Sequence, residues 1–326
     1  MSQRPSDASF GTSVATLAGV RFIGVAAGFA VGIIGARLLD PAGFGAAGVA
    51  LTIGMVAALV GNAGVNIAAI YLISRLPERR DAVIRAMSTI ALVGSALAAA
   101  LALLAGAVLA APLGLPGRDA LFAAAAILGV AIIGFEYGGA ILLALGRRGA
   151  YTATDLVRSI GALVITAGLL AVWREDAGYV MAAALSYLVA AGIAITIGER
   201  ATHALRPAWH PDLLRRGIDI GLRGQVGNVL QFLNLRLDLL LIPALLQLSA
   251  AGIYLVAVRV SEVITQVANA ASSLIFPAVA AQPDRSSTEL TERTVRLSLV
   301  LVIVAGLALM LIAEPLLLVA FGAAYV

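Results

Sequence analysis

Charged side chains stand inside long apolar stretches of this sequence, where each one needs a chemical reason. An arginine guanidinium stays charged and holds a phosphate through two parallel hydrogen bonds, and a buried carboxylate can couple to a cation. Ionisable residues inside apolar segments of this length are functional candidates by default. The charged residues in question are Arg21, Arg223, Arg236, Arg259, Glu136, Asp219, Asp238 and Glu262.

The surroundings of these charges follow from composition. The chain has 326 residues, of which 61% are hydrophobic and 12% are charged, and its mean hydropathy is +1.01. A soluble domain is about 25% charged and much less apolar. We therefore expect an all-α integral membrane protein, because lipid offers the backbone no hydrogen-bond partners and only helices satisfy it internally.

Apolar stretches long enough to cross a hydrocarbon core of about 30 Å recur along the whole chain. The sequence predicts about nine membrane-spanning helices, at 12–38, 43–73, 86–110, 120–145, 159–173, 179–198, 217–246, 251–281 and 297–313. A tenth is expected to begin near Pro315.

Arginine predicts the orientation, since the chain contains no lysine. Most loop arginines fall on one side of the membrane, in alternate loops around 75–85, 147–158, 200–216 and 285–296, together with Arg4. The other side has only Arg37, Arg118 and Arg174. The positive-inside rule then places the N-terminus in the cytoplasm, and the net charge of +4 needs no nucleic-acid partner.

A polar loop after six spans predicts two lobes. We expect an N-terminal six-helix lobe at 1–198, a cytoplasmic linker at 199–216 and an incomplete C-terminal lobe at 217–326. A weak internal repeat supports this division at constant offset: Leu38, Leu39, Gly45, Val49, Ala50 and Asn62 match Leu245, Leu246, Gly252, Val256, Ala257 and Asn269. Such a parallel repeat is typical of two-lobed transporters.

Helical spacing predicts which polar residues face a central cavity. One stripe in the seventh span is formed by Asp219, Arg223, Gly227, Gln231, Asn234 and Asp238, and one in the eighth by Arg259, Glu262, Gln266, Asn269 and Ser273. The candidate substrate-binding residues are Arg21, Arg223, Arg259, Gln231, Asn234, Asn62 and Asn269. The candidate coupling or gating residues are Glu136, Asp219, Asp238 and Glu262.

Each of these candidates also has a structural interpretation. Arg223 with Asp219, and Arg259 with Glu262, stand at helical pairing distance and can be ion pairs that fix packing. The glycine face of the first span, which carries Arg21, matches the small-residue rule for close helix contact. Arg236 lies off the stripe and is expected to pair within its own lobe or to extend toward the membrane surface.

Metal, thiol and cofactor chemistry have little support in the sequence. No cysteine occurs, which excludes disulfides and thiolate nucleophiles. His203 and His210 lie in one polar loop and are expected to be solvated. No loop is long enough to hold a catalytic domain, and no nucleotide-binding motif is present. We expect no metal site, no cofactor and no enzymatic activity; a membrane glycosyltransferase or polymerase and a purely structural subunit are the less favoured alternatives.

Several segments resemble a known family. They are "ARLLDPAGFGAAGVAL" at 36–51, "LRLDLLLIPALLQLSAAGIYLVAVRVSEVI" at 235–264, "FPAVAAQ" at 276–282 and "LLVAFGAAY" at 317–325. They look like the polysaccharide-biosynthesis flippases of the MATE-related superfamily. The resemblance covers essentially the whole chain, and its most specific residues run from Arg37 to Gly45, with Asp238, the run from Gly252 to Tyr254, Phe321, Gly322 and Tyr325.

The resemblance implies about 12 to 14 helices in two lobes around a central cavity. It also implies transfer of polyprenyl-diphosphate-linked oligosaccharide across the inner membrane. Because the family continues beyond the "FGAAY" turn, it implies a fragment or a truncated product. The expected partners are this lipid-linked substrate, membrane lipids, and a polysaccharide polymerase or glycosyltransferases. A cation-coupled multidrug antiporter of the same superfamily is the alternative: a net positive cavity favours the lipid headgroup, and a net negative one favours cations.

Overall fold

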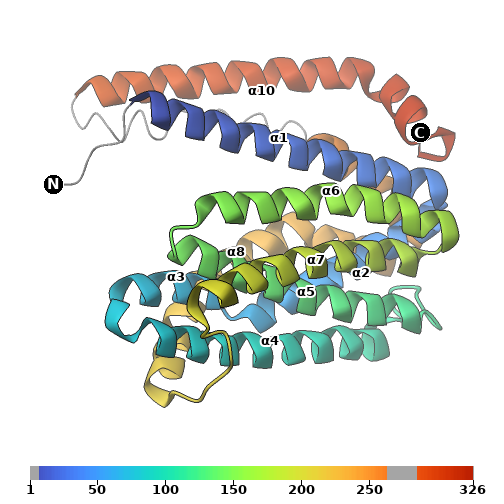
Figure 1. Ribbon diagram of the computed structural model, residues 1–326. Helices are drawn as coiled ribbons and strands as arrows, with labels where there is room; N and C mark the ends of the chain where they lie inside the picture. The colour runs from blue at the N-terminus through green and yellow to red at the C-terminus, as the bar shows by residue number, and fades with distance from the viewer. Residues whose placement is uncertain (1–6, 263–284, 326) are drawn as a thin grey trace.

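The computed structural model describes residues 7–262 and 285–325, and the regular structure within these ranges is helical throughout (Figure 1). The N-terminal helices are α1 (Asp7–Leu38), α2 (Pro41–Asn62), α3 (Val65–Arg75), η1 (Pro77–Arg79), α4 (Arg80–Leu109), α5 (Asp119–Ala144), α6 (Arg148–Val172) and α7 (Asp176–Thr202). The C-terminal part has α8 (Pro211–Leu245), a helix described over 248–262, α10 (Arg285–Ala320) and η2 (Ala323–Tyr325).

Local sequence explains where several helices begin and end. The Asp40 side chain accepts a hydrogen bond from the backbone N of Gly43 at 2.6 Å, and Pro41 opens α2 at a position where a missing N–H costs nothing. Pro211 opens α8 in the same way. His203 ends α7 in the left-handed conformation, with φ 52°. The connection between the two halves is therefore the short stretch 203–210.

Most of these helices are long enough to span a membrane. Among the described residues, seven helical segments are long and apolar enough to cross a membrane, and Ile23–Leu38 is a shorter apolar helix. The all-helical, multi-pass prediction is confirmed. The span expected at 43–73 is one candidate span, Pro41–Arg75, although its helix is interrupted between α2 and α3. One detail was wrong: α10 continues through Pro315 to Ala320, so no new helix begins at that proline.

The break between α2 and α3 has a backbone cause. Ala63 and Gly64 both adopt left-handed conformations, with φ 46° and 72°, which end the helical hydrogen-bond ladder. The backbone of Gly64 lies directly against Gly221 of α8, where a Cβ on Gly64 would lie 2.1 Å from the Gly221 carbonyl oxygen. This close approach packs α8 against α2 and α3.

The packed interior is centred on α2 and α5. The helix α5 contacts α7, α4, α2 and α3, and most of the apolar residues of α2 are buried. The apolar faces of α4, α6 and α10 are mostly exposed, as expected for helices that meet lipid. Residues of α8, of the 248–262 helix and of η2 join the same core, so both halves of the chain share one buried cluster.

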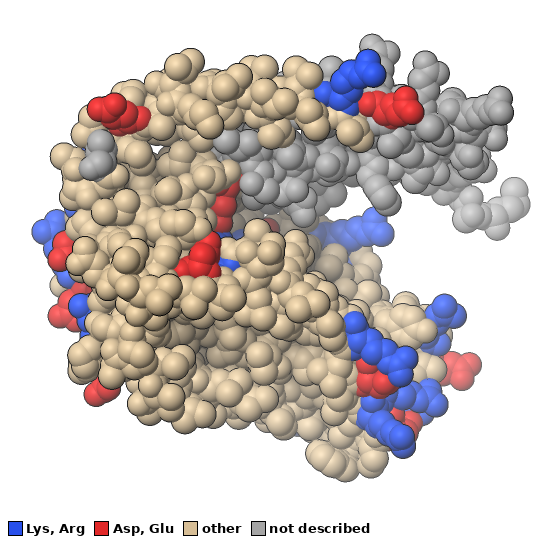
Figure 2. Space-filling model, turned by 180° about the vertical axis from the view of Figure 1, so that it is seen from behind, with Lys and Arg blue, Asp and Glu red and all other residues tan. Residues whose placement is uncertain are grey.

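Charged side chains gather at one end of the helices. The junction of α3 and α4, the 203–210 connection and the start of α8 carry many of the arginines, and Arg79 pairs there with Asp212 at 2.8 Å. The opposite end holds the α1–α2 and α6–α7 turns and the end of α10 (Figure 1). On the described surface, blue and red side chains gather at the arginine-rich end (Figure 2).

Candidate functional site

Glu136 lies in the middle of α5 and faces the break between α2 and α3. Asn62, the last residue of α2, is 2% exposed and donates a hydrogen bond from Nδ2 to Glu136 Oε2. Asn66, in the first turn of α3, donates from its own Nδ2 to the same oxygen at 3.4 Å. The Asn62 Oδ1 atom meanwhile accepts the backbone N–H of Val65 at 3.0 Å, so one side chain both caps α3 and holds the carboxylate.

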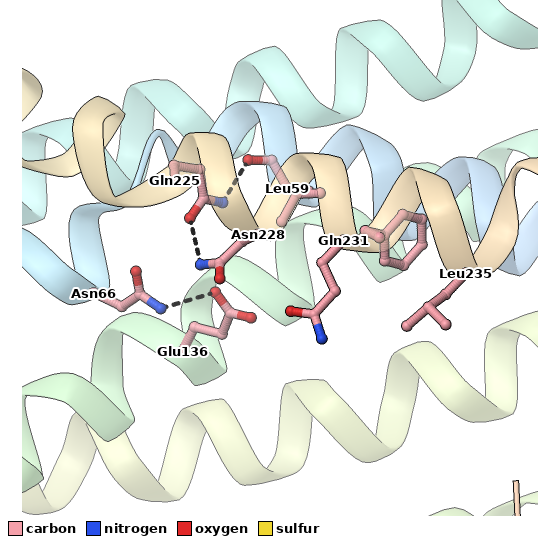
Figure 3. Close-up of a pocket in the computed structure, with 8 residues that line it drawn as sticks. Leu59, Asn66, Glu136, Gln225, Asn228, Gln231 and Leu235 are labelled. Atoms are coloured by element: carbon pink, nitrogen blue, oxygen red, sulfur yellow. Dashed lines mark hydrogen bonds between the residues drawn. The ribbon is translucent and has the colours of Figure 1, made fainter. Parts of the chain in front are cut away.

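A cavity of about 260 Å³ opens beside Glu136 toward α8. Its α8 wall is made mostly of amides, and Figure 3 shows them facing Glu136 and Asn66. Gln225 donates from Nε2 to the backbone carbonyl of Leu59 at 2.9 Å and accepts from Asn228 at 3.1 Å. The remaining lining residues are Gln231, Phe232 and Leu235. The cavity is therefore walled by both halves of the chain.

A second cavity, of about 270 Å³, shares Asn66 and Glu136 with the first. It extends away from α8, between α3, α5, α6 and α7. Its lining residues are Asn66, Ile70, Phe135, Glu136, Ala140, Leu143, Tyr151, Arg158 and Tyr187. Glu136 thus stands at the junction of two chambers, one facing α8 and one inside the N-terminal lobe.

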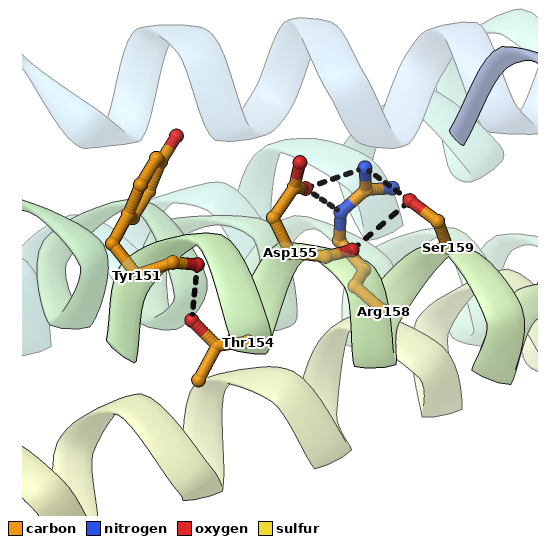
Figure 4. A network of polar contacts seen from close by, with 5 residues as sticks. All are labelled: Tyr151, Thr154, Asp155, Arg158 and Ser159. Atoms are coloured by element: carbon orange, nitrogen blue, oxygen red, sulfur yellow. Dashed lines mark hydrogen bonds and ion pairs between the residues drawn. The ribbon is translucent and has the colours of Figure 1, made fainter. Parts of the chain in front are cut away.

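Arg158 supplies the positive charge of the inner chamber. It comes from α6, and its side chain is 24% exposed. Its Nε and Nη2 atoms donate to Asp155 Oδ1 at 3.0 and 2.8 Å, and Nη2 also reaches Ser159 Oγ at 3.2 Å (Figure 4). The guanidinium lies over the rings of Phe135 and Tyr187, at 5.5 and 5.0 Å from their centroids.

These two chambers can bind a polar, largely neutral molecule. The Glu136 carboxylate accepts hydrogen bonds, the amides of α3 and α8 both donate and accept, and Asp155 balances the charge of Arg158. Cation–π contacts lower the cost of holding the guanidinium away from water. Net charge in the described lining is therefore close to zero or negative, and not strongly positive.

The charged end of the α8 stripe lies elsewhere. Asp219 and Arg223 pair at 2.9 Å, and the Arg223 side chain is 79% exposed. They line a separate open cavity of about 550 Å³ at the arginine-rich end, with Asp212, Arg215 and Arg216. The two side chains form the ion pair that their spacing predicted, but the pair is exposed and does not fix helix packing. Of the stripe residues, Gln231 lines the chamber beside Glu136, whereas Asn234 is exposed outside it.

Polar contacts join α8 to the helix at 248–262. Arg236 pairs with Glu262, and Arg259 Nη1 reaches the same carboxylate at 3.2 Å, so one acid holds two arginines. The expectation that Arg236 pairs within its own lobe is confirmed. Asp238 accepts a hydrogen bond from the Tyr254 hydroxyl. The Arg259 side chain also lies along Gly32 of α1, at 3.9 Å from the position of a Cβ there.

Two predicted site residues cannot be placed. The Arg21 side chain and Asn269 both lie outside the described residues. Metal ligation has no support among the described residues, since no group of three or more His, Asp or Glu side chains that could hold an ion is found in them.

Sequence reasoning missed several residues of the chambers. Asn66, Gln225 and Asn228 are amides outside the stripes, and Arg158 was assigned to a cytoplasmic loop because the fifth span was expected to begin at 159. In the structure α6 begins at Arg148, ten residues earlier than Arg158 along the helix. For the two amides of α8 the sequence does hold a signal, which is spacing: Gln225, Asn228, Phe232 and Leu235 repeat at three- and four-residue steps.

Known proteins resemble this chain in two ways. Residues 34–326 match the family model of the polysaccharide biosynthesis proteins. A solved structure described as the inward-facing conformation of a multidrug resistance MATE family transporter of the MOP superfamily is similar over 88% of this chain and 70% of its own length, with a TM-score of 0.64 and 16% sequence identity. No match was found among curated proteins.

At that level of identity the structural likeness establishes the fold alone. It confirms the two-lobed helical transporter architecture predicted from the sequence. The family match covers almost the whole chain, including the α2–α3 break, both chambers and the end of α10. The chain is a multi-pass membrane protein of transporter fold, and it belongs to the family of polysaccharide biosynthesis proteins.

Proposed function

We propose that this protein is a flippase that moves polyprenyl-diphosphate-linked oligosaccharide from the cytoplasmic to the outer leaflet of the inner membrane, for the synthesis of a surface polysaccharide. The observation that carries the proposal is a pair of chambers lined by amides from both halves of the chain, in a protein of the polysaccharide biosynthesis family. Sugar hydroxyls are small neutral groups that both donate and accept, as amides do.

The two parts of such a substrate differ in charge, because the sugar is neutral and the diphosphate headgroup is negative. The chambers around Glu136 are close to neutral and suit the sugar. The open cavity at the arginine-rich end carries Arg215, Arg216 and Arg223 against Asp212 and Asp219, and among the described contacts neither Arg215 nor Arg216 forms an ion pair. Diphosphate oxygens are well matched to such guanidinium groups. We infer that the headgroup enters here and that the sugars extend toward Glu136.

Arg158 is the arginine that we assign to the sugar side. Its side chain lies in the wall of the inner chamber, over the rings of Phe135 and Tyr187. The roles predicted for Arg21, Arg223 and Arg259 in substrate binding, and for Glu136, Asp219, Asp238 and Glu262 in coupling, are kept as part of the proposal. With the cytoplasm negative, moving two negative charges outward releases about 4.6 kcal/mol at 100 mV.

Complementation of a strain lacking the protein tests this function. Arg158→Gln and Gln231→Ala are expected to reduce surface polysaccharide at unchanged membrane abundance, because each removes a contact to the carried sugar. Arg158→Lys is expected to recover only part of the loss, because a point charge lacks the planar fork. Arg174→Gln, on an exposed turn at the opposite end, is the control and is expected to export normally. Normal export by both chamber variants would refute the proposal.

A cation-coupled multidrug antiporter is the second candidate. It is supported by Glu136, whose hydrogen-bond partners are neutral amides and not a cation, and by the multidrug transporter of the same fold. Expression in a drug-sensitive strain separates the two functions. Drug resistance that depends on Glu136, without any effect on surface polysaccharide, would favour the antiporter.

A further inference from the structure

Two glycines that the internal repeat aligns with each other are in contact in the structure. Gly45 lies in the first turns of α2, and Gly252 in the first turns of the helix at 248–262. A Cβ on Gly45 would lie 2.1 Å from the Leu248 carbonyl oxygen, and a Cβ on Gly252 would lie 2.0 Å from the Pro41 carbonyl oxygen. The two contacts are reciprocal, as expected for equivalent positions on either side of a pseudo-two-fold axis.

Backbone meets backbone at this contact, so no side chain can move aside. A small residue on each helix is what permits so close an approach in a membrane. Next along α2, a Cβ on Gly48 would lie 2.6 Å from Leu255 Cδ2, and Leu255 is buried. The N-terminal and C-terminal halves are therefore close-packed along this stretch.

A second set of contacts ties α1 to the end of α10. Arg37 donates from Nε to the Ala320 carbonyl at 2.9 Å and from Nη2 to the Val319 and Leu318 carbonyls. The last carbonyls of a helix lack intrahelical partners and carry the negative end of its dipole, so a guanidinium is a well-matched cap. Arg37 comes from one half of the chain, and the carbonyls come from the other.

Aromatic residues close the space between these two contacts. The Tyr325 hydroxyl donates to the Ala36 carbonyl at 3.2 Å, and the Tyr325 ring meets Phe44 edge to face at 6.2 Å between centroids. Phe321 meets Phe29 at 5.7 Å. Phe44, Phe321 and Tyr325 are all buried. The family-like segments at 36–51, 248–254 and 317–325 thus meet one another in space, away from the residues that line the chambers.

We infer that these contacts form an outer latch, defined as Arg37 on the end of α10, the Gly45–Gly252 contact, and the aromatic residues Phe44, Phe321 and Tyr325. The latch stands at the arginine-poor end, which the positive-inside rule assigns to the outside, while the open cavity lined by Arg215, Arg216 and Arg223 lies at the other end. It closes the chambers from the outside in this conformation, and it opens when the two halves separate at that end. The inference rests on the proposed transport activity but not on the identity of the substrate.

Replacement of either glycine by a larger residue tests the latch. The natural chain has no cysteine, so a single cysteine at Leu235, in the wall of the chamber beside Glu136, gives a label without background. Gly45→Ala and Gly252→Ala are expected to increase the labelling rate by an impermeant thiol reagent from outside by at least fivefold, because the added methyl group forces the halves apart. Gly192→Ala is the matched control, since nothing lies within 4 Å of a Cβ there.

Arg37→Gln provides a second test that does not disturb the interior. Arg37 is exposed, and its loss removes the cap on α10 without a steric clash. Increased labelling in Arg37→Gln and in either glycine variant that reaches the membrane would support the latch. Labelling of Arg37→Gln at the parent rate, or an equal increase in Gly192→Ala, would overturn it. The readout is independent of polysaccharide export, so a failure of the proposed function leaves it interpretable.

Discussion

Asn62 connects local backbone structure to the chemistry of the site. Its Oδ1 atom caps α3 and its Nδ2 atom holds Glu136, so the side chain sets both the break in the helix and the position of the carboxylate. Asn66 contacts the same oxygen at 3.4 Å but is less buried and caps nothing but its own neighbour, Ile67. Asn62 therefore contributes more to the local structure than Asn66 does.

Asn62→Ala is expected to destabilise the protein by about 2 to 4 kcal/mol, because it removes a helix cap and leaves a buried carboxylate short of a donor. Asn66→Ala, the control, is expected to cost less than about 1 kcal/mol, since its bond is long. Thermal unfolding in detergent compares them. Equal losses in the two variants would show that Asn62 is not the residue that holds the break.

The sequence identified some members of the site and not others, for reasons visible at this scale. Arg236 stood out as a charge off the stripe, and its ion pair with Glu262 agrees with that interpretation. Glu136 stood out as an acid inside the N-terminal spans, and its coupling role stays a prediction; α6 places a second acid, Asp155, within a span. Arg158 was missed because a charge near a helix end looks like a loop residue. The amides Gln225 and Asn228 carry no charge, so only their three- and four-residue spacing with Phe232 and Leu235 could have pointed to them.

At the scale of elements, α8 is positioned by glycines on both sides of its contacts. Gly221 meets the α2–α3 break, and a Cβ on it would lie 2.3 Å from the Ala63 carbonyl oxygen. Gly217 meets Met87 of α4, and Gly224 meets Ile67 of α3. Hydrophobic periodicity predicted that α8 exists, but its rotation and depth depend on these contacts between distant segments. That is why the predicted stripe and the observed chamber wall differ.

Gly221→Ala is expected to push α8 away from α3 and to lower the thermal unfolding temperature. The added methyl group meets backbone atoms that cannot rotate away, and overpacking of this kind costs about 1 to 3 kcal/mol. Gly227→Ala, with nothing within 4 Å of its Cβ, is expected to be neutral or to stabilise α8 by up to about 1 kcal/mol. An unfolding temperature for Gly221→Ala at or above that of Gly227→Ala would contradict this account of the packing.

At the scale of the whole molecule, the loops that are rich in arginine lie at one end of the helices, and the loops that are poor in arginine lie at the other. The arginine-rich end holds the junctions around 75–85, 145–148 and 203–211, and the other end holds the outer latch. The sequence predicted this alternation and the helical class well, because both depend on composition and period alone. It could not predict the broken second span or the uninterrupted α10, because a left-handed pair of residues and a tolerated internal proline are decided by tertiary contacts.

Topology follows from this arrangement and can be measured in intact cells. A cysteine at Ser287, near the start of α10, and one at Arg148, at the start of α6, are expected to be protected from an impermeant thiol reagent. A cysteine at Asp119, at the start of α5, is expected to be labelled, because it lies at the arginine-poor end. Permeabilised cells, in which all three positions should react, provide the control. Labelling at Ser287 in intact cells would show that the protein has the opposite orientation in the membrane.

Transfer of the lipid-linked sugar itself is the most direct test of the account. The purified protein is placed in liposomes that carry polyprenyl-diphosphate-linked oligosaccharide in both leaflets, and a glycosidase added outside digests what reaches the outer leaflet. The parent protein is expected to expose nearly all of the substrate, protein-free liposomes about half, and Arg158→Gln an intermediate amount at a much reduced rate. Exposure by the parent protein that stays at the level of protein-free liposomes would contradict the proposal that these chambers carry an oligosaccharide across the membrane.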